Sequence, residues 1–267
     1  MRWVRNVGIA FLLTVALACL LADFVAPSYA RQFRDEPDAA PSRQHLLGTD
    51  DLGRDRFARV LYGTRVSLLL APAAALLSSV LAVLIGGAAG FAGGWVERII
   101  MAATDLFLSL PWLFLLITVR ALLPLNVSPI ASVAITFALL GCLGWAAAAR
   151  VICADARSLA RSDFILLARA SGSSGFRLLW RQAVPNLRPI VFAQFWISVP
   201  VFILAEANLG VLGLGVAEPL PSWGSLLREL QSYSAITGQP WQFVPLILFV
   251  VVVSCFHLVL LEQESTA

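Results

Sequence analysis

The chain has 267 residues, of which 59% are hydrophobic and 13% are charged, and its mean hydropathy is +0.84. A chain this apolar cannot hide its hydrophobic surface inside one soluble core, so the composition predicts a protein with several membrane-spanning helices. All 19 basic residues are arginine, and the absence of lysine excludes a P-loop nucleotide site and Schiff-base chemistry, both of which need a lysine.

Six apolar runs are long enough to cross a membrane, because about 20 helical residues span its hydrocarbon core. They comprise residues 7–27, 66–92, 99–123, 129–149, 189–209 and 243–261. The first run resembles a cleaved signal peptide, since Arg2 and Arg5 precede it and small residues follow at 28–30, but its apolar part is longer than such a peptide needs. We therefore interpret it as a retained span and predict an all-α membrane protein with six transmembrane helices.

The predicted spans divide the chain into four parts. These are an N-terminal transmembrane helix at 1–28, a first loop at 29–65, a five-helix core at 66–261 and a short tail at 262–267. The first loop and a charged loop at 150–188 fall on opposite sides of the membrane, and both are rich in arginine, so their charges alone do not set the orientation. Arg2 and Arg5 favour a cytoplasmic N-terminus, which places the first loop outside the cytoplasm and the charged loop inside.

Two features of the second and third predicted spans concern helix packing. Gly86, Gly87 and Gly90 lie close together in the second span, and small residues allow two helices to approach closely. Arg120 lies near the outer end of the third span, where we expect its long side chain to extend to the membrane interface.

The charged loop at 150–188 contains a short amphipathic pattern. Its apolar residues recur at helical spacing on one face, opposite Arg177 and Arg181, and are Phe176, Leu179, Trp180, Ala183 and Val184. Gly172 and Ser173 break the chain before this predicted helix, and Pro185 ends it. Such a helix between two spans can bind either the bilayer surface or a groove in a soluble protein, and its spacing leaves both interpretations open.

Two carboxylates, Asp105 and Glu206, fall inside predicted spans and are expected to be buried. Ionisable groups in a membrane are costly and usually face a cavity or a partner, so each is either a contact on a translocation pathway or a structural hydrogen-bonding group. Glu206 is the better candidate for a pathway or gate, together with Asn208, because a glycine-rich segment follows at 210–215.

The sequence offers no pattern of catalytic or metal-binding residues. The four cysteines are scattered singly and are interpreted as packing residues, while His45 and His257 are too far apart in sequence to suggest a shared ligand set. The arginines lie beside predicted spans rather than in a basic domain. We therefore expect a lipid-embedded protein that is not an enzyme, holds no cofactor or metal and binds no nucleic acid.

Three blocks of sequence resemble the permease subunits of the dipeptide, oligopeptide and nickel ABC importer family. The first is HLLGTDDLGRD at 45–55, continued by LYGTRVSL at 61–68. The second is ARASG at 168–172, with Pro185-Asn186 at the family's usual spacing. The third is ILAEANL at 203–209, followed by LGLGV at 212–216 and PSWG at 221–224. The blocks follow the family's order and cover most of the chain from 45 to 225.

The resemblance implies a type I ABC importer permease with six transmembrane helices, located in the inner membrane and moving peptides or similar small solutes by alternating access. Its implied partners are a homologous second permease, two ABC ATPase subunits and an extracytoplasmic solute-binding protein. The ATPases would grip a cytoplasmic coupling element formed by Phe164, Ala168, Arg169, Ala170, Gly172, Phe176, Trp180, Pro185 and Asn186. The family usually has a glutamate where this chain has Leu166, and we interpret this departure as a match to a divergent ATPase.

Two other functions remain open on the residues alone. One is a secondary transporter driven by a proton or sodium gradient, with Asp105 and Glu206 as ion sites. The other is a membrane scaffold that descends from a permease but transports nothing.

Overall fold

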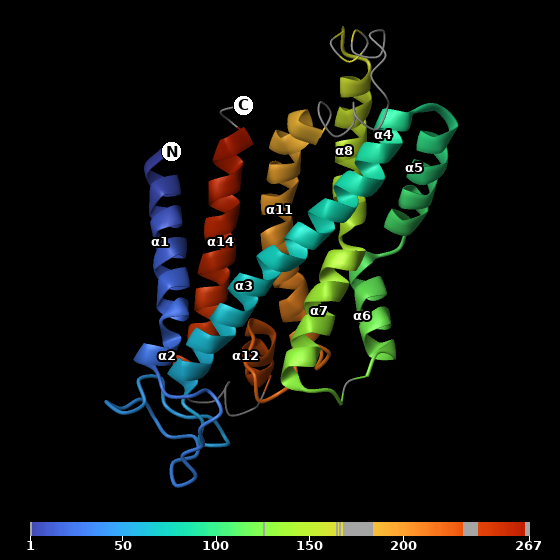
Figure 1. Ribbon diagram of the computed structural model, residues 1–267. Coiled ribbons are helices and arrows are strands. Elements are labelled where there is room, and N and C mark those ends of the chain that lie inside the picture. The colour runs from blue at the N-terminus through green and yellow to red at the C-terminus, as the bar shows by residue number, and fades with distance from the viewer. Residues whose placement is uncertain are drawn as a thin grey trace. The chain divides into compact units, whose positions relative to one another are not determined.

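The computed structural model describes residues 2–124, 126–163, 165, 167, 184–231 and 240–264 of the chain, and within them it is helical (Figure 1). The helices are α1 (Arg2–Leu20), α2 (Ala22–Val25), α3 (Arg56–Ala82), η1 (Val83–Gly87), α4 (Ala88–Ala92), α5 (Gly94–Ser109), α6 (Trp112–Leu122), α7 (Pro129–Leu143), α8 (Trp145–Ala160), α11 (Val184–Val211), α12 (Trp223–Glu229), η3 (Pro240–Phe243) and α14 (Val244–Glu264). The described β-type pairing consists of two isolated bridges in the first loop. The prediction of an all-α protein is confirmed.

Among the described residues, four helical stretches are long and apolar enough to cross a membrane. They are Arg56–Ala92, Pro129–Ala160, Pro185–Val211 and Pro240–Leu260. A fifth span results if α5 and α6, which meet at an angle of 82°, are counted together. The apolar part of α1, Arg5–Leu20, is shorter than a typical span. The prediction of six transmembrane helices is therefore confirmed only in its coarser form, a helical protein with four or five candidate spans.

Proline explains the break in the predicted third span. Pro111 carries no backbone N–H and restricts the residue before it to extended conformations. Leu110 accordingly has φ −79° and ψ 133°, and the helix stops at Ser109 and restarts at Trp112. The apolar pattern through residues 99–123 is continuous, but the helix that carries it is not.

Several helices extend beyond the apolar runs that predicted them. Helix α3 begins at Arg56, within the predicted first loop, because its first turns are held by polar contacts to that loop. Helix α8 continues the fourth span to Ala160, within the predicted charged loop, after a short break at Gly144. Helix α11 begins at Val184, before the apolar run. Apolarity alone marks the part of a helix that can face lipid and misses its polar ends.

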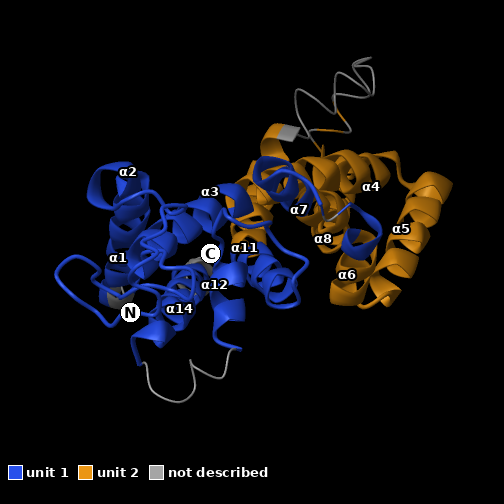
Figure 2. Cartoon of the chain, turned by 90° about the horizontal axis from the view of Figure 1, so that it is seen from below, with its two compact units in different colours: residues 1–71, 120–137, 200–267 blue, residues 72–119, 138–199 orange. Residues whose placement is uncertain are grey.

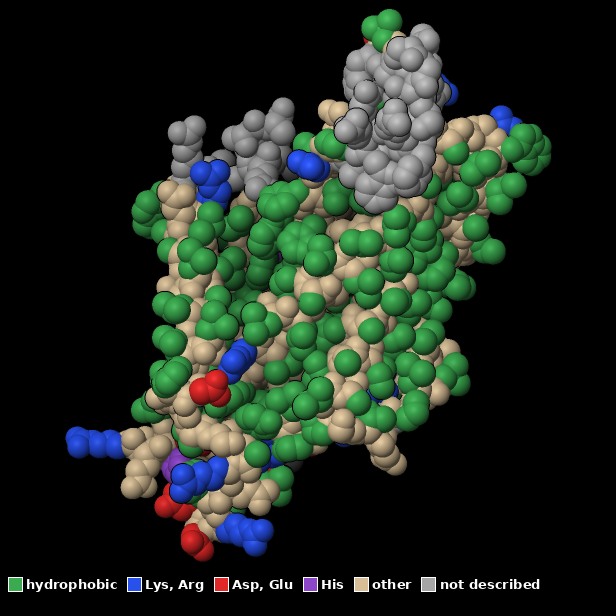
Figure 3. All heavy atoms as spheres, in the orientation of Figure 1, with side chains coloured by type: hydrophobic (Ala, Val, Ile, Leu, Met, Phe, Trp, Pro, Cys, Tyr) green, Lys and Arg blue, Asp and Glu red, His purple; other side chains and the backbone are tan. Residues whose placement is uncertain are grey.

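The chain forms two compact units (Figure 2). Unit 1 comprises residues 1–71, 120–137 and 200–267, and unit 2 comprises residues 72–119 and 138–199. In unit 1, α1 packs beside α14, where Gly8 lies against Val259 and Cys255. The visible face of the helices carries mainly apolar side chains, whereas arginine and acidic side chains gather over the first loop (Figure 3).

In unit 2, η1 and α4 pack against α8 at backbone distance. A Cβ atom on Gly86 would lie 2.1 Å from the carbonyl oxygen of Ala149, and one on Gly90 would lie 2.2 Å from that of Cys153. A Cβ atom on Gly87 would lie at ordinary contact distance, 3.9 Å from Val83 and 4.0 Å from Ile152 of α8. The prediction of close helix packing is confirmed for Gly86 and Gly90. Gly87 is also buried beside α8, but its position leaves room for a methyl group.

Candidate functional site

The first loop is a compact structure built by the HLLGTDDLGRD block. Gly48 and Gly53 have φ values of +70° and +72°, and a Cβ atom on either would lie 2.2 Å from a backbone oxygen of the same loop. The Asp50 carboxylate accepts the backbone N–H groups of Leu52 and Arg54 at 3.0 and 2.7 Å. These contacts explain why the block combines glycines with aspartates: the glycines permit the turns and the aspartate fixes them.

A network of arginines and carboxylates joins this loop and the start of α3 to the segment around α12. The Arg59 guanidinium is completely buried and donates to Glu229 Oε1 at 2.5 Å and to Glu218 Oε1 at 3.2 Å. Arg54 Nη1 donates to Glu218 Oε2 at 2.6 Å, and Arg54 Nε to Asp50 Oδ2 at 2.6 Å. A planar guanidinium has five donors, which lets one buried arginine serve several carboxylates at once.

Opposing influences act on the two glutamates of this network, both of which lie outside the candidate spans. Burial acts to raise the pKa of Glu218, but hydrogen bonds and charges from Arg59 and Arg54 outweigh it and hold that pKa below its ordinary value. For Glu229 burial is the stronger influence, and its pKa lies above the ordinary value despite Arg59 and Arg56.

The PSWG block forms the start of α12 and contacts α3. Ser222 caps the helix, since its side chain accepts the Ser225 N–H while the Ser225 hydroxyl accepts the Ser222 N–H. The Trp223 indole is buried and donates to Thr64 Oγ1 at 2.9 Å. Gly224 meets Gly210 of α11, and a Cβ atom on Gly224 would lie 2.7 Å from the Gly210 Cα atom. Glycine at both positions permits this contact.

Glu206 and Asn208, the predicted pathway pair, have different surroundings. Glu206 is completely buried and its Oε2 accepts the Ser67 hydroxyl at 3.1 Å. Ser222 and the Gly224 backbone lie near the same carboxylate, although its Oε1 makes no hydrogen bond of standard geometry with the described residues. The Asn208 side chain is exposed and donates to the Leu204 carbonyl at 2.9 Å. The structure does not bring the two side chains together, and a pathway role for either stays a prediction.

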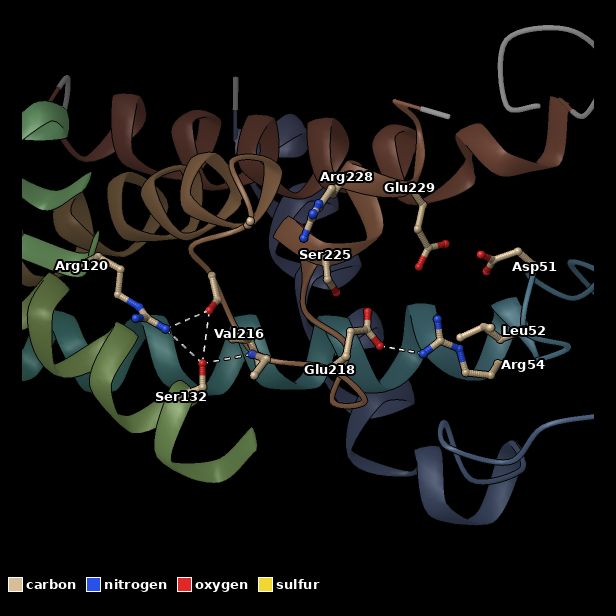
Figure 4. A pocket seen from close by; sticks show the side chains of 14 residues that line it. Asp51, Leu52, Arg54, Arg120, Ser132, Val216, Glu218, Ser225, Arg228 and Glu229 are labelled. Carbon is tan, nitrogen blue, oxygen red and sulfur yellow. Dashed lines mark hydrogen bonds and ion pairs between the residues drawn. The ribbon is translucent and has the colours of Figure 1, made fainter. Parts of the chain in front are cut away.

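A pocket of about 420 Å³ opens in unit 1 beside the arginine and carboxylate network (Figure 4). Its charged and polar walls are formed by Arg54, Arg120, Ser132, Glu218, Arg228 and Glu229. The glycine-rich segment at 213–217 supplies backbone to the same wall. The pocket thus collects residues from the first loop, α6, α7, the end of α11, the segment before α12 and α12 itself.

The prediction that the Arg120 side chain extends to the membrane interface is wrong. This side chain is 1% exposed and points into the pocket instead of extending to an interface. One signal was present in the sequence, because Arg120 is the single charged residue between Asp105 and Arg150. An isolated charge in a long apolar stretch indicates a buried functional or structural group.

The expectation that Asp105 is buried is wrong. Its side chain is 51% exposed and its Oδ1 lies 2.8 Å from Arg150 Nη1, so α5 and α8 share a surface ion pair within unit 2. Burial was expected because Asp105 lies within an apolar run, but α5 presents this face to the surface of unit 2.

The predicted coupling element lies largely outside the described residues. This applies to Phe164, Ala168, Arg169, Ala170, Gly172, Phe176 and Trp180. Pro185 and Asn186 are described and occupy the first turn of α11, where a missing backbone N–H costs no helical hydrogen bond. Their part in coupling stays a prediction.

Comparison with known proteins identifies the family. A profile described as "Binding-protein-dependent transport system inner membrane component" matches residues 82–262. The chain belongs to this family. It is accordingly a multi-pass transport protein of the inner membrane and not an enzyme.

Individual relatives match most of the chain. The dipeptide transport system permease protein DppC of Bacillus subtilis is 32% identical over 83% of this chain and 68% of its own length. The oligopeptide transport system permease protein OppC of the same organism is 34% identical, over 86% of this chain and 74% of its own. The glutathione transport system permease protein GsiD of Pectobacterium atrosepticum is 31% identical, over 92% and 80%. The resemblance inferred from the three sequence blocks is confirmed.

Proposed function

We propose that this chain is the membrane-spanning permease subunit of an ATP-driven importer for short peptides or similar small solutes. The observation that carries the proposal is its similarity to family members named for dipeptide, oligopeptide and glutathione transport. Dipeptides, oligopeptides and glutathione are all short peptides. Family membership also favours a binding-protein-dependent importer over the gradient-driven transporter and the scaffold.

In the proposed arrangement the chain crosses the membrane six times. Helix α1 has 19 residues, and at about 1.5 Å per residue it approaches the roughly 30 Å thickness of the hydrocarbon core. We take α1 as the first span and the bent pair α5–α6 as the third. The N-terminus and the charged loop at 150–188 then face the cytoplasm, and the first loop, the pocket and α12 face outward.

The proposed partners bind at opposite faces of the membrane. Two ATPase subunits engage the coupling element at 164–186 of this chain and the matching element of a second permease. An extracytoplasmic binding protein delivers the solute to the outer face. Because the chain has no lysine for a P-loop, the energy of ATP must enter through such a partner contact.

The proposed function is tested most directly by identifying the energy source for uptake. The complete importer should be reconstituted in proteoliposomes, and uptake of a labelled peptide measured with ATP or a non-hydrolysable analogue on the cytoplasmic side. Uptake should require ATP and both ATPase subunits, and should persist after the proton and sodium gradients are collapsed. Gradient-driven uptake by this chain alone, lost in Glu206→Gln, would establish the secondary transporter instead. Assembly of the complex without any flux would support the scaffold.

A further inference from the structure

The pocket of unit 1 contains a buried cation that no described carboxylate neutralises. Arg120 Nη2 lies 3.4 Å from Ser132 Oγ and 3.5 Å from the Gly215 carbonyl, and Nη1 lies 3.5 Å from the Pro124 carbonyl. These distances are at the long limit for a hydrogen bond, and Arg120 Nε has no partner among the described residues. A buried charge is normally paired, because removing it from water without a counter-charge is costly.

The polar groups around Arg120 already form hydrogen bonds within the fold. Ser132 Oγ donates to the Gly215 carbonyl at 3.2 Å and accepts the Ala217 N–H at 3.0 Å, so this hydroxyl fixes the glycine-rich wall. The undescribed segment at 232–239, which follows α12 in the chain, contains neither aspartate nor glutamate. The guanidinium lines the pocket, and an anion bound there would supply the counter-charge that the described residues do not provide.

A second arginine lies along the same pocket. Arg228 is exposed at the end of α12, makes no ion pair with the described residues, and passes over Gly213, where a Cβ atom would lie 3.2 Å from its Nη1. Figure 4 shows Arg120 at one side of the pocket, Arg228 between, and the carboxylates of Glu229 and Asp51 at the other side. The Glu218 carboxylate is held by Arg54 and Arg59, and the Glu229 carboxylate is held by Arg59 and Arg56. Among the described residues that line the pocket, Arg120 and Arg228 at one side have no carboxylate partner, and Asp51 at the other side has no ion pair.

We propose that this pocket binds a short peptide zwitterion, with its free carboxylate at Arg120 and Arg228 and its ammonium group facing Asp51. Guanidinium groups bind carboxylates through paired, charge-assisted hydrogen bonds. A volume of about 420 Å³ lies within the range of small-molecule sites. The inference rests on the proposed function and adds to it a recognition site in the permease itself, separate from the selection made by a binding protein.

The test is direct binding to the importer without its binding protein. The permease pair and ATPases in lipid nanodiscs should be examined by saturation-transfer NMR with trialanine, trialanine amide and N-acetyl-trialanine. We expect the amide to bind about tenfold more weakly than the free acid, because it loses a charge-assisted contact. In Arg228→Gln this preference for the free acid should largely disappear. Arg31→Gln, which removes an equal charge from an exposed site outside the pocket, should retain it.

Arg120→Gln should show the larger loss, and Arg228→Gln keeps the test valid if the buried substitution prevents folding. Equal binding of acid and amide to the wild type would overturn the proposal, as would an unchanged preference in Arg228→Gln. So would a variant that binds trialanine normally but associates poorly with the binding protein, since the pocket would then receive a protein carboxylate. ATP-driven uptake in the same preparation separates these results from a failure of the proposed function.

Discussion

Arg59 and Glu229 form an ion pair of 2.5 Å between residues 170 positions apart in the sequence. Arg59 lies in the first turn of α3 and Glu229 ends α12, so the contact fastens the segment after α11 to the start of α3 within unit 1. Glu218 and Asp50 share the same guanidinium. The three carboxylates share this buried cation, and each also contacts Arg54 or Arg56.

Removing that cation should be strongly destabilising. We expect Arg59→Ala to lower the free energy of unfolding by about 3–5 kcal/mol, because it removes the completely buried counter-charge that the three carboxylates share. Arg65→Ala breaks a partly exposed ion pair with Asp23 and should cost less than about 1 kcal/mol. Thermal unfolding of the purified importer measures both. Similar losses in the two variants would show that the network contributes no more than a surface pair.

The lowered pKa of Glu218 predicts a pH dependence. A carboxylate whose pKa is depressed in the folded state stabilises the fold above its unfolded value, near 4.5, and loses this contribution as the pH falls through its folded value. Glu218→Gln should therefore reduce the melting temperature most above pH 4.5, and the difference from wild type should shrink as the pH falls below that point. A difference that stays constant down to pH 3.5 would contradict the assignment.

The close packing of unit 2 predicts opposite results for neighbouring glycines. Gly86→Ala forces a methyl group against the Ala149 carbonyl and should cost about 1–3 kcal/mol, as overpacking does. Gly87→Ala adds the same group where its nearest neighbour is 3.9 Å away and should behave as wild type. The yield and melting temperature of the purified importer distinguish them, and equal behaviour would argue against the backbone contact.

The proposed orientation can be tested by thiol labelling. Leu52→Cys and Ser173→Cys, each in a background without the four native cysteines, should differ on intact cells exposed to a membrane-impermeant reagent. Leu52 is exposed on the first loop and should react, whereas Ser173 should react only after permeabilisation. The reverse pattern would show that the arginines of the first loop set the orientation.

The coupling element is tested by substitutions at its predicted turn and apolar face. Gly172→Arg, or alanine at both Phe176 and Trp180, should abolish ATP-driven uptake and co-purification with the ATPases while the protein remains in the membrane. Ser158→Ala, on an exposed position of α8, serves as the control. Normal association and uptake in both altered proteins would remove this segment from the ATPase contact.

Periodic and local features of the fold could be predicted from the sequence, and the pocket could not. The apolar runs identified the long helices. Pro111 causes the break between α5 and α6, but the apolar run continues on both sides of it and so predicted a single helix. The pocket assembles Arg54, Arg120 and Arg228 from segments far apart in the chain, and no local pattern connects them. Asp105 and Arg120 are both single charges in apolar surroundings, and only tertiary packing makes one exposed and the other buried.

The glycine contacts between η1, α4 and α8 determine how displacement passes through unit 2. Helix α8 ends at Ala160, immediately before the segment that we assign to the ATPases. At Gly86 and Gly90 its carbonyl groups meet the neighbouring helix without intervening side chains, and Arg157 also binds Glu97 at 2.9 Å. Side chains can change rotamer and absorb small shifts, whereas two backbones in contact cannot. If the segment after Ala160 contacts the ATPases as proposed, a displacement of the end of α8 would pass to η1 and α4 directly through these backbone contacts.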